Sequence, residues 1–136
     1  MQKPVIEQAA PHPVTVERFF GAIQAADGAT LAELLDPDSV THWPQTGERI
    51  TGAQACIRVY ADYPGGPPAF RLERIVGSGD VWVAQFAADY GTESWFGLSI
   101  CEFRGPRISR ITDYFAPALP APEWRRQYVD PIGVPA

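Results

Sequence analysis

The sequence predicts a single α+β domain in which helices precede an antiparallel sheet. Apolar residues recur at helical spacing over residues 13–26, whereas from Ala69 onward they alternate with a period of two. Pro64-Gly65-Gly66-Pro67-Pro68 separates these two halves. A chain of 136 residues has the length of one domain. Helices followed by a run of tightly linked strands are typical of α+β folds rather than of parallel nucleotide-binding folds.

Two helices are predicted at the start of the domain. The first spans about 13–26, where Pro13 suits the first turn because its missing N–H needs no partner there. Its predicted buried face consists of Val16, Phe19, Phe20 and Ile23. Asp27 is a favourable N-cap for a short second helix that carries Leu31, Leu34 and Leu35. We expect Asp36-Pro37-Asp38 to end this helix, because proline disfavours helical geometry at the preceding residue.

A short strand and a third helix complete the first half. Residues 39–43 form the candidate strand, and residues 45–48 have the composition of a turn. Thr51 and Gln54 have the spacing of a capping box. The sequence therefore predicts a third helix over about 52–62.

The second half predicts four strands in an antiparallel meander. Short glycine-containing links at 77–79, 91 and 105–106 are of the kind that join antiparallel neighbours. The strands are expected at about 69–77, 80–90, 93–104 and 107–115.

We divide the chain into an N-terminal arm (1–12), the domain itself (13–116) and a proline-rich C-terminal tail (117–136). Because an exposed Trp is costly, Trp124 is expected to hold the tail against the body or a neighbouring molecule.

The sheet is predicted to be apolar on both of its faces. Trp82, Ala84, Phe86 and Ala88 share one face, and Val83, Gln85, Ala87 and Asp89 share the other. If helices cover the second set, the first set still needs burial. We therefore expect a homodimer that packs through the outer sheet face.

Composition excludes several classes of protein. The formal net charge of −5 argues against a nucleic-acid partner, and no apolar run is long enough for a membrane span. We find no secretory signal and expect a cytoplasmic protein. Cys56 and Cys101 lie within apolar patterns and are interpreted as core residues. No metal-binding or cofactor-binding motif is present, so we expect neither metal nor cofactor.

Asp113 is the candidate catalytic residue. A carboxylate inside the β-branched and aromatic run of residues 108–115 is unfavourable by strand propensity. If Ile111 and Phe115 face the core, the period of two places Asp113 beside them. Burial without a cation would raise its pKa and suit it to proton transfer. The alternative is a structural Asp113 at a sheet edge, paired with Arg104, Arg107 or Arg110.

Further residues are candidates for the wall of a pocket around Asp113. Gln85 and Ser99 are expected to hydrogen-bond a substrate or a water molecule. The expected apolar wall consists of Phe19, Trp43, Tyr60 and Phe115. His42, next to Trp43 on the short strand, is expected to face the opposite way and to be partly exposed.

The order of elements, the Thr51-Gly52 helix start, and Arg107-Ile108 followed by Asp113-Tyr114-Phe115 resemble the nuclear transport factor 2-like superfamily in its SnoaL-like branch. The resemblance covers about residues 13–116. It implies a cone-shaped half-barrel in which a curved, mostly antiparallel sheet and three helices enclose one pocket. Members of this superfamily include ketosteroid isomerases, polyketide cyclases and limonene-epoxide hydrolases, so the fold alone does not fix the reaction.

The resemblance also implies which catalytic groups this chain lacks. The positions of the ketosteroid isomerase base, oxyanion tyrosine and second aspartate look like Trp43, Phe19 and Ser99. The limonene-epoxide hydrolase base is matched by Asp113. The partner Arg and Asp of those hydrolases fall near Gln85 and Ala87, and their water-holding Tyr and Asn fall near Thr41 and Trp43. Asp113 is thus the ionisable group that the resemblance marks as facing the cavity.

Two functional hypotheses follow. The first is a pocket for a small apolar or aromatic molecule in which Asp113 acts as general acid or base in isomerisation, cyclisation, dehydration or hydration. Epoxide hydrolysis is less favoured because its partner groups are missing. The second hypothesis is a non-catalytic ligand-binding or dimerisation module with a structural Asp113.

Overall fold

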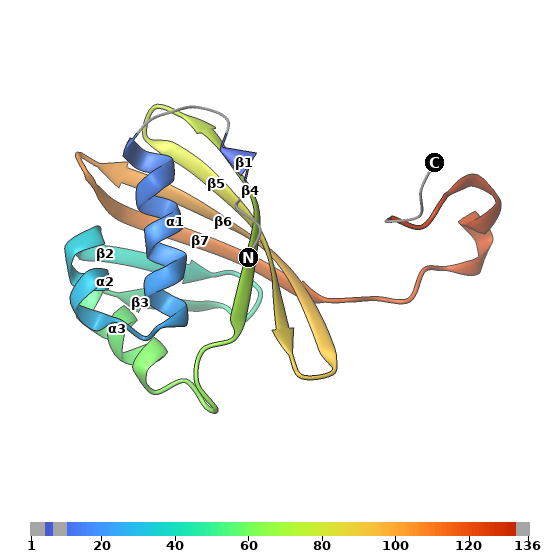
Figure 1. Cartoon of the computed structure of the whole chain (residues 1–136), viewed down its shortest axis with the longest axis horizontal. Helices are drawn as coiled ribbons and strands as arrows, with labels where there is room; N and C mark the ends of the chain where they lie inside the picture. The colour runs from blue at the N-terminus through green and yellow to red at the C-terminus, as the bar shows by residue number, and fades with distance from the viewer. Residues whose placement is uncertain (1–4, 7–10, 133–136) are drawn as a thin grey trace.

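The computed structural model describes residues 5–6 and 11–132, and within them seven strands form one mixed sheet (Figure 1). The strand order across the sheet is β1-β4-β5-β6-β7-β2-β3. The strands are β1 (Val5–Ile6), β2 (Leu35–Trp43), β3 (Glu48–Thr51), β4 (Ala69–Ser78), β5 (Val81–Tyr90), β6 (Glu93–Arg104) and β7 (Arg107–Pro117). The helices are α1 (Pro11–Gln24), α2 (Gly28–Leu34), α3 (Ala53–Ala61) and the 3-10 helix η1 (Glu123–Tyr128).

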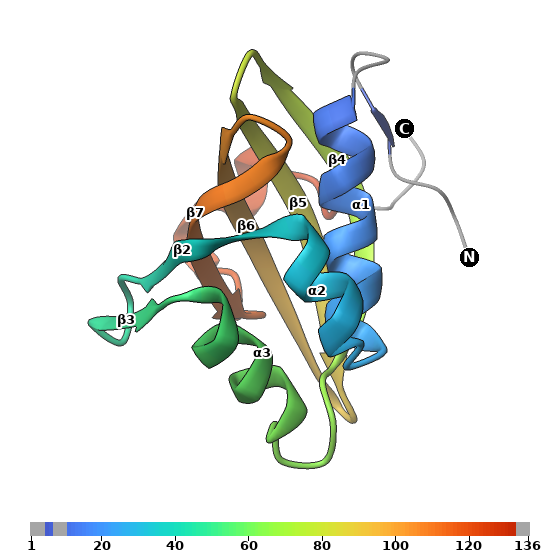
Figure 2. The same cartoon turned by 90° about the vertical axis from the view of Figure 1, so that its left-hand side faces the viewer.

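The sheet is strongly curved, and α1, α2 and α3 all lie on the same side of it (Figure 2). Strands β4, β5, β6 and β7 are successive antiparallel neighbours, whereas β2 pairs with β7 in parallel. The predicted α+β class, with three helices against a curved and mostly antiparallel sheet, is confirmed. The four predicted meander strands all exist, and their predicted ends lie within two residues of the observed ones.

The boundary between the second helix and the first long strand was wrong in the sequence interpretation. The α2 helix ends at Leu34, and β2 begins at Leu35 and continues through Pro37. Leu35 is fully buried and pairs in register with Ile108 of β7. The apolar residues of α2 therefore continue into β2 without a change in composition. The composition does not show where the helix ends, and the pairing of β2 with β7 sets this boundary.

The start of α3 also differs from the expected capping box. Residues 48–51 form β3, which pairs with the end of β2 in an antiparallel hairpin, so Thr51 belongs to a strand. The N-cap of α3 is Gly52, at a φ of 93° that favours glycine, and no side chain caps this helix. Its backbone N–H instead donates to the carbonyl oxygen of Ser39 at 2.7 Å. The pairing of β3 with β2 therefore takes the place of the predicted capping box at Thr51.

The predicted N-terminal arm contains regular structure. Residues 5–6 form β1, which pairs in parallel with Arg74 and Ile75 of β4, and α1 begins at Pro11 rather than Pro13. The rest of the predicted arm lies outside the described residues. Short aperiodic segments such as this one carry no pattern that predicts edge pairing.

The hydrophobic core lies between the concave face of the sheet and the helices. Trp82, Ala84, Phe86 and Ala88 are all buried on this inner face. This corrects the sequence-based premise, because the helices cover this set rather than the set with Gln85. On the opposite, outer face several large apolar side chains are exposed: Val81, Phe96, Leu98 and Tyr114.

We predict opposite effects for two Gly→Ala substitutions. At Gly77 a Cβ atom would overlap the carbonyl oxygen of Val81 and lie 2.7 Å from Cα of Trp82, so Gly77→Ala should destabilise the fold by about 1–3 kcal/mol. At the exposed Gly21 of α1, an added Cβ atom would have no described atom within 4 Å, apart from its chain neighbours and the nearby backbone of its own helix. Gly21→Ala should therefore stabilise the fold by about 0.5–1 kcal/mol. Urea denaturation measures both changes. Equal effects of the two substitutions would contradict the close packing of Trp82 on Gly77.

Candidate active site: a buried carboxylate in an aromatic pocket

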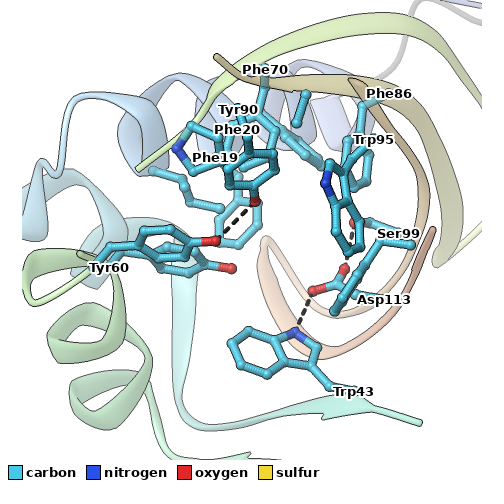
Figure 3. A pocket seen from close by; sticks show the side chains of 15 residues that line it. Phe19, Phe20, Trp43, Tyr60, Phe70, Phe86, Tyr90, Trp95, Ser99 and Asp113 are labelled. Atoms are coloured by element: carbon cyan, nitrogen blue, oxygen red, sulfur yellow. Dashed lines mark hydrogen bonds between the residues drawn. The ribbon is translucent and has the colours of Figure 1, made fainter. Parts of the chain in front are cut away.

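A cavity of about 170 Å³ lies between the helices and the concave face of the sheet. Aromatic rings form most of its wall (Figure 3). Among the described residues, Asp113 is the one carboxylate that lines it, and no Lys, Arg or His does. The lining residues are Phe19, Phe20, Ile23, Trp43, Tyr60, Tyr63, Pro68, Phe70, Phe86, Ala88, Tyr90, Trp95, Ser99, Asp113 and Phe115. The cavity thus offers a large apolar surface with a few polar atoms.

Asp113 reaches the cavity from β7, where the alternation of the strand turns Ile111 and Asp113 inward. Its side chain is held by two neutral donors. The hydroxyl of Ser99, directly opposite on β6, donates to Oδ1 at 2.5 Å, and Nε1 of Trp43 donates to Oδ2 at 2.9 Å. One donor on each oxygen fixes the plane of the carboxyl group and leaves further lone pairs available to a ligand.

The electrostatic environment of Asp113 favours its protonated form. Asp113 is 8% exposed, and burial raises the pKa of its carboxyl above the ordinary range, while the hydrogen bonds from Ser99 and Trp43 oppose the shift. None of the ion pairs in the described residues involves Asp113. Two of the three arginines considered as partners pair with other carboxylates: Arg104 with Asp36 and Arg110 with Glu102. The arrangement is therefore that of a desolvated acid, not of a structural ion pair.

Tyr60 provides a second polar group in the cavity. It is placed by α3, it is buried, and its hydroxyl points toward the space in front of Asp113 (Figure 3). Burial, and then the charge of Asp113, raise the pKa of this phenol well above its ordinary value. Tyr60 therefore stays protonated at neutral pH and can donate a hydrogen bond to a bound molecule.

A pair of tyrosines that the sequence interpretation missed lies on the wall of the cavity. The hydroxyl groups of Tyr63 and Tyr90 lie 2.9 Å apart, and the ring of Tyr90 packs edge-on against Trp95. Tyr63 follows α3 and Tyr90 ends β5, so both lie next to turns in the sequence. Residues beside turns carry no periodic signal, and only the tertiary structure brings these two together.

The structure brings most of the predicted site residues together. Five predicted lining residues do line the cavity with Asp113: Phe19, Trp43, Tyr60, Ser99 and Phe115. Gln85 does not line the cavity, so the prediction that places it in the pocket is wrong. It lies on the outer face of β5, where its Nε2 donates to Glu73 at 3.1 Å. The helices cover the other face of β5, so the period of two turns Gln85 outward.

The two cysteines are buried and are not candidates for nucleophilic chemistry. Burial raises the pKa of the Cys56 thiol to about 11 and also raises that of Cys101. Among residues 5–6 and 11–132, no group of three His, Cys, Asp or Glu side chains is arranged to hold a metal ion. None of the helices in the same residues has the length and apolarity to cross a membrane.

Comparison with known proteins places this geometry in a family. The model of the SnoaL-like domain family matches residues 16–111. An NTF-2 like protein of unknown function from Burkholderia xenovorans LB400 is 31% identical, with a TM-score of 0.81 over 90% of this chain and 96% of that one. A candidate ketosteroid isomerase from Kribbella flavida is 26% identical, with a TM-score of 0.80 over 93% and 91% of the two chains. No curated protein matches the sequence.

A more distant structure shares the fold alone. An LEH-like epoxide hydrolase from M. tuberculosis is 23% identical, with a TM-score of 0.67 over 78% of this chain and 83% of that one. At this level of identity the similarity concerns the arrangement of helices and strands and says nothing about shared chemistry.

We predict that Asp113→Asn stabilises the protein at neutral pH. Because the folded-state pKa of Asp113 is raised, the folded protein holds more protons than the unfolded chain just above the ordinary Asp pKa. The stability of the wild type should therefore fall as pH rises through this window and stay lower above it, and Asp113→Asn should abolish this fall. Urea denaturation from pH 4 to pH 8 measures the effect.

The matched control is Glu102→Gln, which makes the same carboxylate-to-amide change on the outer face. We expect it to change the free energy of unfolding at neutral pH by less than about 1 kcal/mol, because Glu102 is about half exposed and its ion pair with Arg110 lies at the surface. A large loss of stability in Asp113→Asn at every pH would instead identify Asp113 as a structural group.

Proposed function

This chain belongs to the SnoaL-like domain family, and on that premise we propose that it binds a small, neutral, apolar or aromatic molecule and transfers a proton with Asp113. The observation that carries the proposal is a buried carboxylate, open to an aromatic cavity, that has two neutral donors and no cation beside it in the part of the chain that the structure describes. Such a group has a raised pKa, which brings its proton affinity closer to the working pH of a general acid–base catalyst. Proton transfer of this kind requires no cofactor.

The proposed reaction begins with removal of a proton from carbon. Ionised Asp113 accepts a proton from a carbon next to a carbonyl group, and the C–H electron pair moves toward the carbonyl oxygen to give an enolate. In a substrate with a β,γ-double bond, the enolate is conjugated, and return of the proton from Asp113 to its γ-carbon completes an isomerisation. In a cyclisation the enolate carbon attacks a second carbonyl, and the alkoxide formed there takes the proton from Asp113. Ser99 and Trp43 keep the carboxyl group in a fixed orientation during both transfers.

Tyr60 is the proposed donor to the enolate oxygen. Its hydroxyl points into the cavity in front of Asp113 and stays protonated because the pKa of the phenol is raised. A neutral donor stabilises the charge that develops on the oxygen more strongly in a dry cavity than in water. The proposed base and the proposed donor come from β7 and α3, so a ligand between them would contact both layers of the fold.

The cavity also suggests the class of substrate. Its volume of about 170 Å³ is close to that of an apolar cavity that holds benzene, roughly 150 Å³. We propose a substrate with one ring or a comparable apolar body. A charged carboxylate on the substrate would find no cation among the lining residues and would be repelled by ionised Asp113.

The alternative function is a non-catalytic ligand-binding module. It is favoured by the resemblance, in which Trp43 and Phe19 stand near the positions of polar groups that act in related enzymes. The same pocket would then bind its ligand without turnover. In either case we propose a homodimer, because Phe96, Leu98 and Tyr114 leave the outer face of the sheet apolar.

We predict that the wild-type protein accelerates exchange of the benzylic protons of phenylacetone in D₂O. This ketone has one ring and an acidic C–H group, and Asp113→Asn should reduce the protein-catalysed rate by about 10²–10⁴-fold. Proton NMR follows the loss of the benzylic signal. Glu102→Gln, the matched amide substitution on the outer face, should leave the rate unchanged.

Each outcome of this experiment separates the two functions. Binding of phenylacetone without acceleration of exchange would support the ligand-binding module. Equal exchange rates for the wild type and Asp113→Asn would exclude Asp113 as the base. No binding at all would contradict a pocket for small aromatic molecules.

We further predict a preference for neutral ligands. Phenylacetone and phenylacetate differ by replacement of a methyl group with a charged oxygen, and phenylacetone should bind at least about tenfold more tightly at pH 7 because the cavity has no cation. Asp113→Asn should narrow this difference by removing the repulsion. Titration followed by NMR chemical shifts measures both affinities. Tighter binding of phenylacetate would overturn the proposed substrate class.

A further inference from the structure

The C-terminal segment of residues 118–132, here called the C-terminal arm, makes almost no contact with the body of its own chain. Every residue of the arm is exposed. Its large apolar side chains are unusually open to solvent, with Trp124 72% and Tyr128 74% exposed. Figure 1 shows the arm leaving the end of β7 and extending away from the sheet on the side opposite α1. Of the two contacts expected for Trp124, the one with its own body is therefore wrong, and the one with a neighbouring molecule stays a prediction.

Prolines explain why the arm does not fold back. Pro117, Pro120 and Pro122 lie where the arm leaves the sheet, and each restricts its own φ angle and lacks a backbone donor. Pro122 has φ −68° and ψ 142°, which is the polyproline II geometry. A segment with this geometry is extended and semi-rigid. The arm is thereby held away from its own sheet, with its aromatic side chains unburied.

The outer face of the sheet offers a complementary surface. Phe96, Leu98 and Tyr114 are about half exposed there, and they surround a shallow hollow over Gly97. The hollow, here called the outer hollow, is lined by Gln45, Glu73, Gln85, Phe86, Phe96, Gly97, Leu98, Tyr114, Phe115 and Ala116. An apolar hollow with a polar rim is the kind of surface that receives an aromatic side chain in an interface.

The charges near Trp124 and at the rim of the outer hollow, and the length of the arm, are also compatible with this contact. Glu73, which also pairs with Arg71 at 3.4 Å, places a carboxylate at the rim of the outer hollow, and Arg125 lies next to Trp124 in the arm without an ion pair in the described residues. Ala116, at the root of the arm, lines the same hollow. The eight steps along the backbone from Ala116 to Trp124 span at most about 25 Å, at roughly 3.1 Å per step in polyproline II geometry. The arm can therefore cross from the hollow of one chain to that of an adjacent chain.

We propose that two copies of this chain form a homodimer by exchange of their C-terminal arms. Trp124 of each copy fills the outer hollow of the other, with Arg125 directed toward Glu73 at its rim. A second copy is the occupant that this argument selects, because each chain carries both halves of the contact and a two-fold axis satisfies both at once. The dimer follows from surfaces outside the aromatic cavity, so it stands or falls independently of the proton-transfer chemistry.

The test is a concentration series by light scattering of the full-length chain and its variants. The wild type should be a dimer at micromolar concentration. Trp124→Ser on the arm and Leu98→Asp on the outer face should each weaken dimerisation by about tenfold or more. The double variant should be weakened no more than the stronger single variant, because both changes remove one contact. Val14→Ser, at an equally exposed apolar position on α1, is the control and should have no effect.

Two results would overturn the proposal. The first is a wild-type chain that is monomeric at micromolar concentration. The second is a dimer that Leu98→Asp dissociates and Trp124→Ser leaves intact, which would show direct packing of two outer faces without the arms. Trp124 is exposed in the single chain, so its replacement should not affect folding, and a far-UV circular dichroism spectrum for each variant checks this.

Discussion

The burial of one carboxylate among aromatic rings is the constraint on which the candidate site depends. Removing Asp113 from water disfavours its ionised form, and the structure offsets this only with the neutral donors Ser99 and Trp43. A nearby arginine would have lowered the pKa and fixed the carboxylate as a permanent anion. No arginine is among the described contacts of Asp113. The carboxyl group can therefore hold or release a proton, which is the property that the proposed chemistry requires.

The curvature of the sheet creates the space in which this group can act. Antiparallel strands turn alternate side chains to opposite faces, and the helices cover the concave face without filling it completely. Large rings line the wall of the cavity, and several meet edge to face, as Phe20 and Phe70 do. The architecture is thus a scaffold for a pocket, and the chemistry is decided by the few polar groups that point into it.

The two faces of the sheet contribute to different sites. The inner face of β6 contributes Ser99 to the cavity, whereas Phe96 and Leu98 on the same strand contribute to the outer hollow. Structures with this fold include a candidate ketosteroid isomerase and an LEH-like epoxide hydrolase. Variation at inward positions can change the reaction while outward positions keep the surface, because the strand period separates the two sets of side chains.

The amino-acid sequence by itself determined the α+β class and the four meander strands, because hydrophobic periodicity is a local property that survives without tertiary context. It placed Asp113 on one face with Ile111, but left open whether that face is turned to the core or to solvent. It also identified Phe19, Trp43, Tyr60, Ser99 and Phe115, since each follows from the face of its own element. Only the tertiary structure decided which face of β5 the helices cover, and this excluded Gln85 from the pocket. It likewise decided that Leu35 begins a strand, that Trp43 donates to Asp113, and that Tyr63 meets Tyr90. These features arise from pairings between residues distant in the chain, and a local pattern contains no information about which distant surface will meet it.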